Sequence, residues 1–195
     1  NNENFGDAVA DVGDANGDSY HDLAVGVPDA DGMGRVLLLF VDGQTGAVLN
    51  AAAPRELAAP MRAVSGDRFG SSLATLSPAN ASGPHLLVGA EDTDGSRGAA
   101  YLVYLGSTSS EDTYEVVDVG AVSGTAVMPS WQLGASAAVA ASELAVDGVL
   151  VVAVGASGGI SDDRMLDDGM LAADLGLVYR VGLARPTASP TATPT

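Results

Sequence analysis

The chain has 195 residues, of which 25 are Asp or Glu and only 8 are basic, so its formal net charge is −17. This balance argues against nucleic acid as a partner, because phosphate binding needs a basic patch. The 47% hydrophobic content excludes disorder for most of the chain, no apolar run approaches the roughly 20 residues of a membrane helix, and the lack of cysteine excludes a disulfide framework.

The first informative stretch is a nine-residue loop, numbers 14–22, which we call the acidic loop. Oxygen-bearing side chains stand at its first, third, fifth and ninth places, and a backbone carbonyl at the seventh can add another oxygen. In chain order these residues are Asp14, Asn16, Asp18, Tyr20 and Asp22. Such alternation directs hard oxygen donors at one cation, and three carboxylates this close repel unless a cation neutralises them. The spacing predicts a Ca²⁺ site, with a metal-free Asp/Asn/Gly turn as the alternative.

The residues beside these donors refine the prediction. An EF-hand would need Glu at the twelfth place and a helix beyond it, but Val25 stands there within an apolar run, so the loop leads into a strand. Ser19 occupies the sixth place, where glycine usually makes the sharp turn, and serine tolerates a positive φ less well. We therefore expect weak affinity of the extracellular class, on the order of 10⁻⁴ to 10⁻³ M.

A large apolar residue followed by glycine recurs with a step of 69 − 5 = 133 − 69 = 64 residues, at Phe5-Gly6, Phe69-Gly70 and Leu133-Gly134. Each pair precedes small residues, then an apolar run ending in glycine (23–26, 86–89, 151–155), then a third strand-like run (36–40, 101–104, 178–181). Such short continuous runs predict strands buried on both faces. A polar outer strand is predicted at 47–50 and at 113–119, but none in the third copy, because proline cannot pair centrally in a sheet.

Phe5-Gly6, the acidic loop and the run ending in Val27-Pro28 together resemble an FG-GAP repeat, the unit of the integrin alpha-subunit β-propeller. The resemblance implies that Phe-Gly opens the innermost strand of each blade, and that the calcium loop joins its first and second strands. We expect an all-β chain of three four-stranded antiparallel propeller blades, at 1–61, 62–130 and 131–184. The third contains an insertion at 156–175 and lacks its outer strand, and a Pro/Thr-rich linker follows at 185–195. A β-sandwich is the alternative, which the 64-residue repeat disfavours.

Two further kinds of site are suggested by short motifs. Two acidic turns between the second and third strands lie on the side that the resemblance implies is ligand-facing, and ordinary polar turns are the alternative. Their acidic residues are Asp29, Asp31, Asp92 and Asp94. An N-glycosylation sequon and a mucin-like tail predict sugar attachment, with chance occurrence and an unmodified linker as the alternatives. The acceptor residues are Asn80, Thr187, Ser189, Thr191, Thr193 and Thr195.

Catalysis finds little support in the sequence. Only His21 and His85 could act as near-neutral bases, each lies in a turn, and no nucleophile with its base can be assembled. We expect a non-enzymatic, extracellular or cell-surface adhesion or scaffold module that uses Ca²⁺ and binds an extracellular protein or glycan. The alternative is an accessory FG-GAP propeller of an extracellular enzyme whose catalytic domain lies outside this chain.

The number of blades predicts partners. Three blades cannot close a ring that usually takes about four to eight, so the end faces would leave apolar strands against water. The missing outer strand of the third blade would also leave an open sheet edge. We expect association with other propeller blades or with neighbouring copies of the chain, which gives a filament if the rotation does not close.

Overall fold

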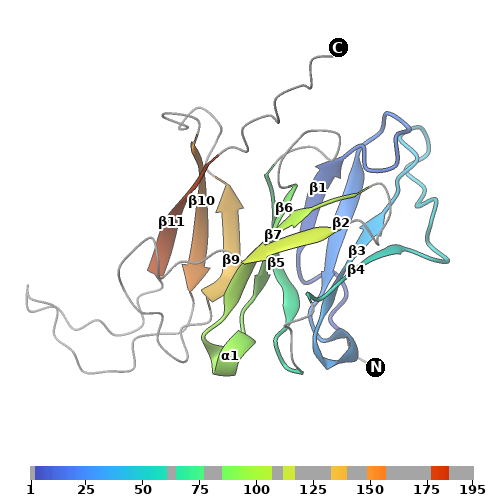
Figure 1. Cartoon of the computed structure of the whole chain (residues 1–195). Coiled ribbons are helices and arrows are strands. Elements are labelled where there is room, and N and C mark those ends of the chain that lie inside the picture. Colours follow the sequence, from blue (N-terminus) through green and yellow to red (C-terminus); the bar gives the residue numbers. More distant parts are fainter. Residues whose placement is uncertain are drawn as a thin grey trace, which may run out of the picture.

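The computed structural model describes residues 3–60, 65–76, 85–106, 112–116, 133–139, 149–156 and 177–184. Within these residues the chain is all-β, which confirms the predicted class, and it forms three antiparallel sheets that follow one another along the chain (Figure 1). The first contains β1 (Val9–Gly13), β2 (Asp22–Val27), β3 (Arg35–Leu39) and β4 (Arg55–Ala58). The second contains β5 (Phe69–Thr75), β6 (Leu86–Ala90), β7 (Ala99–Tyr104) and β8 (Thr113–Val116). The third contains β9 (Leu133–Val139), β10 (Val149–Ala156) and β11 (Leu177–Ala184).

In each sheet the strands pair in chain order, as up-and-down meanders. A short helical turn follows the second strand of the first two sheets, namely η1 (Ala30–Gly32) and α1 (Thr93–Ser96). No helix in the described residues is long and apolar enough to cross a membrane. The sheets do not close into a ring within the described residues, so the propeller remains a proposal.

The 64-residue repeat is visible in the backbone. Asn4 and Arg68 both have positive φ, at 55° and 58°, although neither is glycine. Gly6 and Gly70 repeat the pattern two residues later, at 90° and 93°. Because positive φ is uncommon for residues other than glycine, the matching pairs show one unusual conformation formed twice by the same local sequence pattern.

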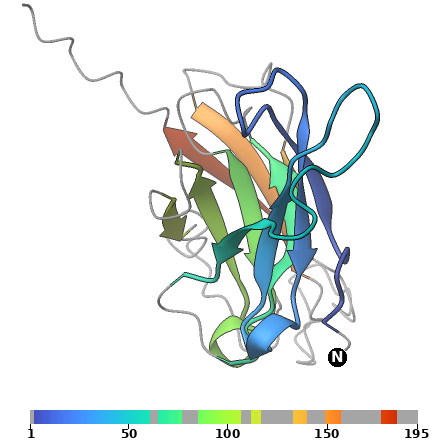
Figure 2. The same cartoon turned by 90° about the vertical axis from the view of Figure 1, so that its right-hand side faces the viewer.

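The core lies between the first and second sheets. Alternate residues of each strand point to one face, and the two facing surfaces supply Ala10, Val12, Ala24, Val36, Leu38, Leu57, Phe69, Leu86, Val88, Ala90, Tyr101 and Val103. Phe69 is fully buried and meets two tyrosines edge to face, Tyr101 at 5.7 Å and Tyr114 at 6.2 Å between ring centroids. The third sheet continues the stack, since β9 packs against β5 and β6 as β5 packs against β1, β2 and β3. Figure 2 shows the sheets along a second direction.

The outer strand of the first sheet was predicted wrongly at residues 47–50. The strand that pairs with β3 is β4, and residues 47–50 form a loop with an isolated bridge between Val41 and Val48. The Asn50 side chain accepts a hydrogen bond from the Phe40 N–H and donates one to the Leu38 carbonyl, so it bonds the β3 end in place of a strand backbone. β4 instead brings Leu57 into the core opposite Val36. The predicted strand at 113–119 is observed as β8, and residues 117–119 lie outside the described residues.

Phe69-Gly70 opens the first strand of its sheet, β5, whereas Phe5-Gly6 does not open β1. Phe5 lies in a turn ahead of β1 and is 62% exposed. Phe69 is held in β5 by a parallel bridge to Gly34 of the first sheet. No described residue offers Phe5 a comparable neighbour. Most of the predicted insertion (157–175) and the whole linker (185–195) lie outside the described residues.

Candidate metal-binding loop

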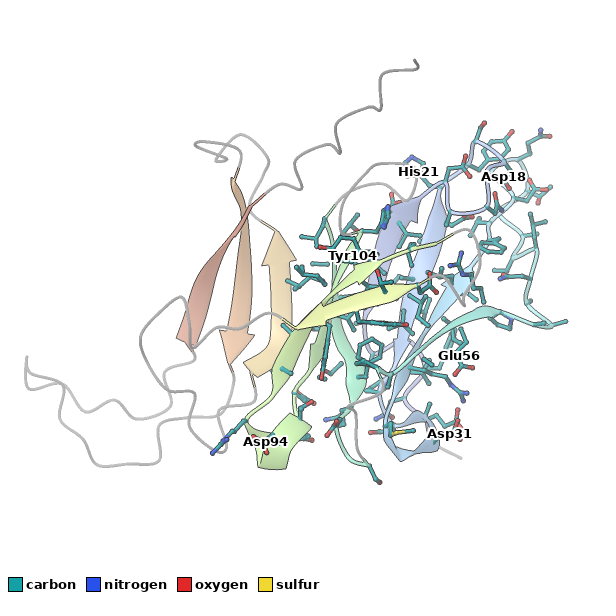
Figure 3. The ribbon with its side chains drawn as sticks, viewed as in Figure 1. Asp18, His21, Asp31, Glu56, Asp94 and Tyr104 are labelled. Atoms are coloured by element: carbon teal, nitrogen blue, oxygen red, sulfur yellow. The ribbon has the colours of Figure 1, made fainter. Side chains whose placement is uncertain are left out.

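The acidic loop connects the end of β1 to the start of β2, where Figure 3 labels Asp18 and His21. The chain turns sharply there because two residues adopt positive φ, Gly17 at 84° and Ser19 at 73°. Ser19 therefore takes the left-handed conformation that the sixth place requires, despite its side chain.

The loop backbone folds around the Asp14 carboxylate. Asp14 Oδ1 accepts hydrogen bonds from the N–H groups of Gly17 at 2.6 Å and Asp18 at 2.9 Å, and its Oδ2 accepts one from Ser19 at 2.8 Å. Three backbone N–H donors converge on this one carboxylate. Asp14 thus sets the shape of the loop.

Asn16 and Asp18 lie against one another on the exposed side of the loop. The Asn16 amide donates to Asp18 Oδ2 at 2.9 Å, while its Oδ1 accepts from the Asp18 N–H at 2.8 Å. Asp18 Oδ1 accepts from the N–H of Tyr20 at 2.9 Å. The Tyr20 ring packs on Gly43, and its hydroxyl lies 3.3 Å from the amide nitrogen of Gln44.

Asp22 has a structural role in addition to its predicted one. It is fully buried, and its two oxygens accept hydrogen bonds from the N–H of Ala15 at 2.9 Å and of Val41 at 3.0 Å. An unpaired buried N–H or carboxylate would be costly, so this pairing ties the acidic loop to the chain that leaves β3. The sequence suggested a ligand at this place but not the contact with Val41.

The donor chemistry of the loop suits a hard cation, whereas the side chains as placed do not converge on one. Among the described residues, no three Asp, Glu or His side chains are arranged to hold a metal ion. Each carboxylate offers about four acceptor positions, and Asp18 and Asp22 each use two of them in the bonds above. Both therefore keep capacity for a cation, and Asn16 would have to release Asp18 to share it.

His21 lies within the acidic loop and pairs with Asp11 of β1, at 2.8 Å and 3.0 Å between its Nδ1 and the two carboxylate oxygens. This hydrogen bond is the main cause that raises the pKa of His21, and the same bond lowers the pKa of Asp11. Both side chains are exposed. Sequence reasoning noted the histidine but missed its partner, which only the pairing of β1 with β2 brings near.

The acidic turns join the second and third strands of their sheets, at the ends of the strands opposite the acidic loop, where Figure 3 labels Asp31 and Asp94. Asp31 pairs with Arg35 at 3.3 Å and Asp94 with Arg97 at 2.8 Å. The remaining two residues also have structural surroundings: Asp29 contacts Asn4 and Arg68, and Asp92 precedes α1 with its N–H directed at the Asp67 carbonyl. Three of the four acidic residues thus meet an arginine of this chain, which favours the polar-turn interpretation.

The predicted glycosylation residues, Asn80, Thr187, Ser189, Thr191, Thr193 and Thr195, all lie outside the described residues. No protein-family model matches the chain, and a comparison with curated proteins finds no significant match. The FG-GAP resemblance therefore rests on the motifs and the repeated geometry described above.

Proposed function

We propose that this chain is a non-enzymatic, extracellular scaffold or adhesion module of FG-GAP type, with Ca²⁺ bound in the acidic loop. The observation that carries the proposal is the repeated backbone conformation at Asn4–Gly6 and Arg68–Gly70, which are 64 residues apart. At residues 68–70 this segment joins the second sheet to the first. A chain that repeats the segment that joins its sheets is suited to building an extended scaffold.

Calcium fits the loop by donor type and charge. Ca²⁺ takes six to eight oxygen ligands in flexible geometry, and carboxylate, amide and backbone carbonyl oxygens are its usual protein donors. Asp14, Asn16, Asp18, the Tyr20 carbonyl and Asp22 would supply them, with waters completing the shell. Because the loop already folds through backbone N–H bonds to Asp14, the cation would need side-chain movement rather than a new turn.

The location follows from the expected affinity. A loop with a dissociation constant on the order of 10⁻⁴ to 10⁻³ M fills only where calcium reaches that range, which is the affinity class of extracellular modules. The net charge of −17 suits the same environment, since divalent cations neutralise an acidic surface.

The surroundings of the two histidines support a non-enzymatic role. His21 is exposed and bonded to a carboxylate, and buried His85 accepts the N–H of Leu105 at its Nδ1, 2.9 Å away. Both rings thus have structural partners. A general base would instead face the proton of a nucleophile or a substrate.

The test is calcium-dependent stability. At free calcium of about 100 times the dissociation constant, binding to the folded state alone adds about 2.7 kcal/mol. For a chain of this size that raises the melting temperature by roughly 5–11 °C. Asp18→Asn should abolish the rise, whereas Asp31→Asn, which removes the same charge from the opposite edge, should keep it. Equal behaviour of both variants, or melting that ignores a chelator, would refute the calcium site.

A further inference from the structure

Besides the core side chains, a short backbone segment joins the first and second sheets, residues 68–70, which we call the internal Phe-Gly segment. The N–H of Phe69 donates to the Met33 carbonyl at 2.9 Å, and Phe69 forms a parallel bridge with Gly34. A Cβ on Gly26 would lie 2.1 Å from the Gly70 carbonyl oxygen, and one on Gly34 would lie 2.3 Å from that of Phe69. Two glycines of the first sheet therefore receive this segment, because any side chain there would exclude it.

Ion pairs also join the two sheets at this contact. Arg68 reaches Asp29 of the first sheet at 3.2 Å and Asp7 at 3.7 Å, and it also pairs with Glu91 of the second sheet. Burial is the main cause that raises the pKa of Glu91, although the positive charge of Arg68 opposes it. The contact thus combines close backbone packing with a charged rim, as specific interfaces do.

The first sheet is preceded by the same kind of segment, but among the described residues no other sheet packs against this one. Residues 4–6, the leading Phe-Gly turn, repeat the φ values of residues 68–70. Phe5 is 62% exposed where Phe69 is fully buried, and Val9, the first residue of β1, is 56% exposed. A Cβ on Gly6 would meet no described atom within 4 Å, whereas one on Gly70 would lie 2.7 Å from the Arg35 carbonyl oxygen.

The third sheet offers the matching receiving position. Gly26 and Gly89 stand at equivalent places in the second strands of the first two sheets, and both are buried. Gly155 holds this place in β10, since it pairs with Ser136 as Gly89 pairs with Ser72. Gly155 is only partly buried. The third sheet therefore presents the receiving glycine with less cover than its two counterparts.

We propose that copies of this chain associate head to tail, with the leading Phe-Gly turn of one copy docking on the third sheet of the next at Gly155. The leading Phe-Gly turn precedes β1 of the first sheet and Gly155 belongs to β10 of the third, and these two sheets lie at opposite ends of the stack in Figure 1. The internal Phe-Gly segment shows how such a turn packs on such a glycine within the chain. This is why the occupant is a second copy rather than a different protein. The contact is heterologous, so it generates a ring if the rotation closes and a filament if it does not. The proposal deepens the scaffold function and rests on it.

Sedimentation velocity of the wild-type chain tests the proposal, at about 0.15 M ionic strength because the like-charged copies repel at lower salt. We expect species larger than the monomer whose share grows with protein concentration. Phe5→Asp should weaken association at least about 30-fold, the effect of losing an interface hot spot. Leu49→Asp is the matched control, because Leu49 is 58% exposed and lies outside the contact, and it should associate like the wild type.

A second variant separates head-to-tail association from a symmetric contact. Gly155→Val keeps a residue that suits a strand but fills the receiving position, and circular dichroism checks that it folds. Phe5→Asp and Gly155→Val should each sediment as monomers, while their mixture should form a one-to-one dimer and nothing longer, since only one intact pair of surfaces remains. A monomeric wild type at about 100 μM, where a contact of micromolar affinity would be formed, would overturn the proposal. So would equal behaviour of Phe5→Asp and Leu49→Asp, or a mixture that stays monomeric.

The same runs with calcium and with chelator separate this proposal from the calcium site. Loss of the calcium-dependent rise in melting temperature with association intact would refute only the metal site. A monomeric chain that calcium still stabilises would refute only the head-to-tail contact.

Discussion

The two phenylalanines of the Phe-Gly motif offer the sharpest test of the fold, because the same dipeptide occurs in two different environments. Phe69 is fully buried and meets Tyr101 and Tyr114 edge to face. Truncating a buried Phe to Ala costs about 3–5 kcal/mol, through the lost transfer energy and the cavity left behind. Phe5 is 62% exposed, so the monomer should lose about 1 kcal/mol or less, in proportion to the part of the ring removed from water.

At roughly 2–4 °C per kcal/mol for a chain of this size, Phe69→Ala should lower the melting temperature by about 6–20 °C, and Phe5→Ala by no more than about 4 °C. Melting is followed by far-ultraviolet circular dichroism at protein concentrations where the chain is monomeric, so that association does not contribute. Equal shifts for the two variants would show that Phe69 does not form the core between the first two sheets.

Three further perturbations test individual contacts. Gly26→Ala should lower the free energy of unfolding in urea by about 1–3 kcal/mol or more, because its Cβ would lie 2.1 Å from a backbone oxygen of Gly70 that cannot move aside. A variant as stable as the wild type would contradict the contact between the sheets. Arg55→Ala should cost about 3–5 kcal/mol, since its partner carboxylate is almost fully buried, whereas the exposed Arg97→Ala should cost less than about 1 kcal/mol. Burial raises the pKa of Tyr114 to about 12, so its contribution to stability should be complete below about pH 10 and fall as the pH rises toward 12. An absorbance titration should show one late tyrosine, which Tyr114→Phe removes.

The strands that could be predicted from the sequence are those whose burial depends on local pattern. The runs ending at Gly26, Gly89 and Gly155 are apolar throughout, and each was found as a strand. In β2 and β6 the apolar run corresponds to burial on both faces of the strand. The repeat was visible for a similar reason. Glycine cannot be replaced where a backbone passes within about 3 Å, so its spacing records the contact between sheets.

The outer strand could not be predicted, because its position depends on side chains far from it. Residues 47–50 and β4 are both short and of mixed polarity. The choice between them follows from Leu57, which fits the core opposite Val36, and from Asn50, whose side chain bonds the end of β3. Neither effect has a periodicity that a local pattern would reveal.

In the acidic loop, the spacing of residues in the sequence predicts only part of the site. The spacing of the carboxylates predicts oxygen donors at alternating places of the loop, but it says nothing of the hydrogen bonds that compete for them. Asp22 bonds Val41, which is 19 residues away, and Asn16 bonds Asp18. Similarly, the pairing of Arg55 with Asp112 joins residues 57 apart, and it depends on the second sheet stacking on the first.

The acidic loop and the contact between sheets lie at opposite ends of the same strand. β2 begins at Asp22, which closes the loop, and ends at Val27, beside the receiving Gly26. At about 3.3 Å per residue these ends are roughly 17 Å apart. Coupling over such a distance needs an element with two discrete arrangements that both sites favour differently. The leading Phe-Gly turn is bonded to this same end of β2, because the Gly6 N–H donates to the Gly26 carbonyl at 2.9 Å. A strand paired on both sides by β1 and β3 offers no second arrangement, so calcium should stabilise the first sheet without changing the affinity of the leading turn for another copy. Assembly would then be controlled by concentration and salt, and the metal would set the stability of each unit.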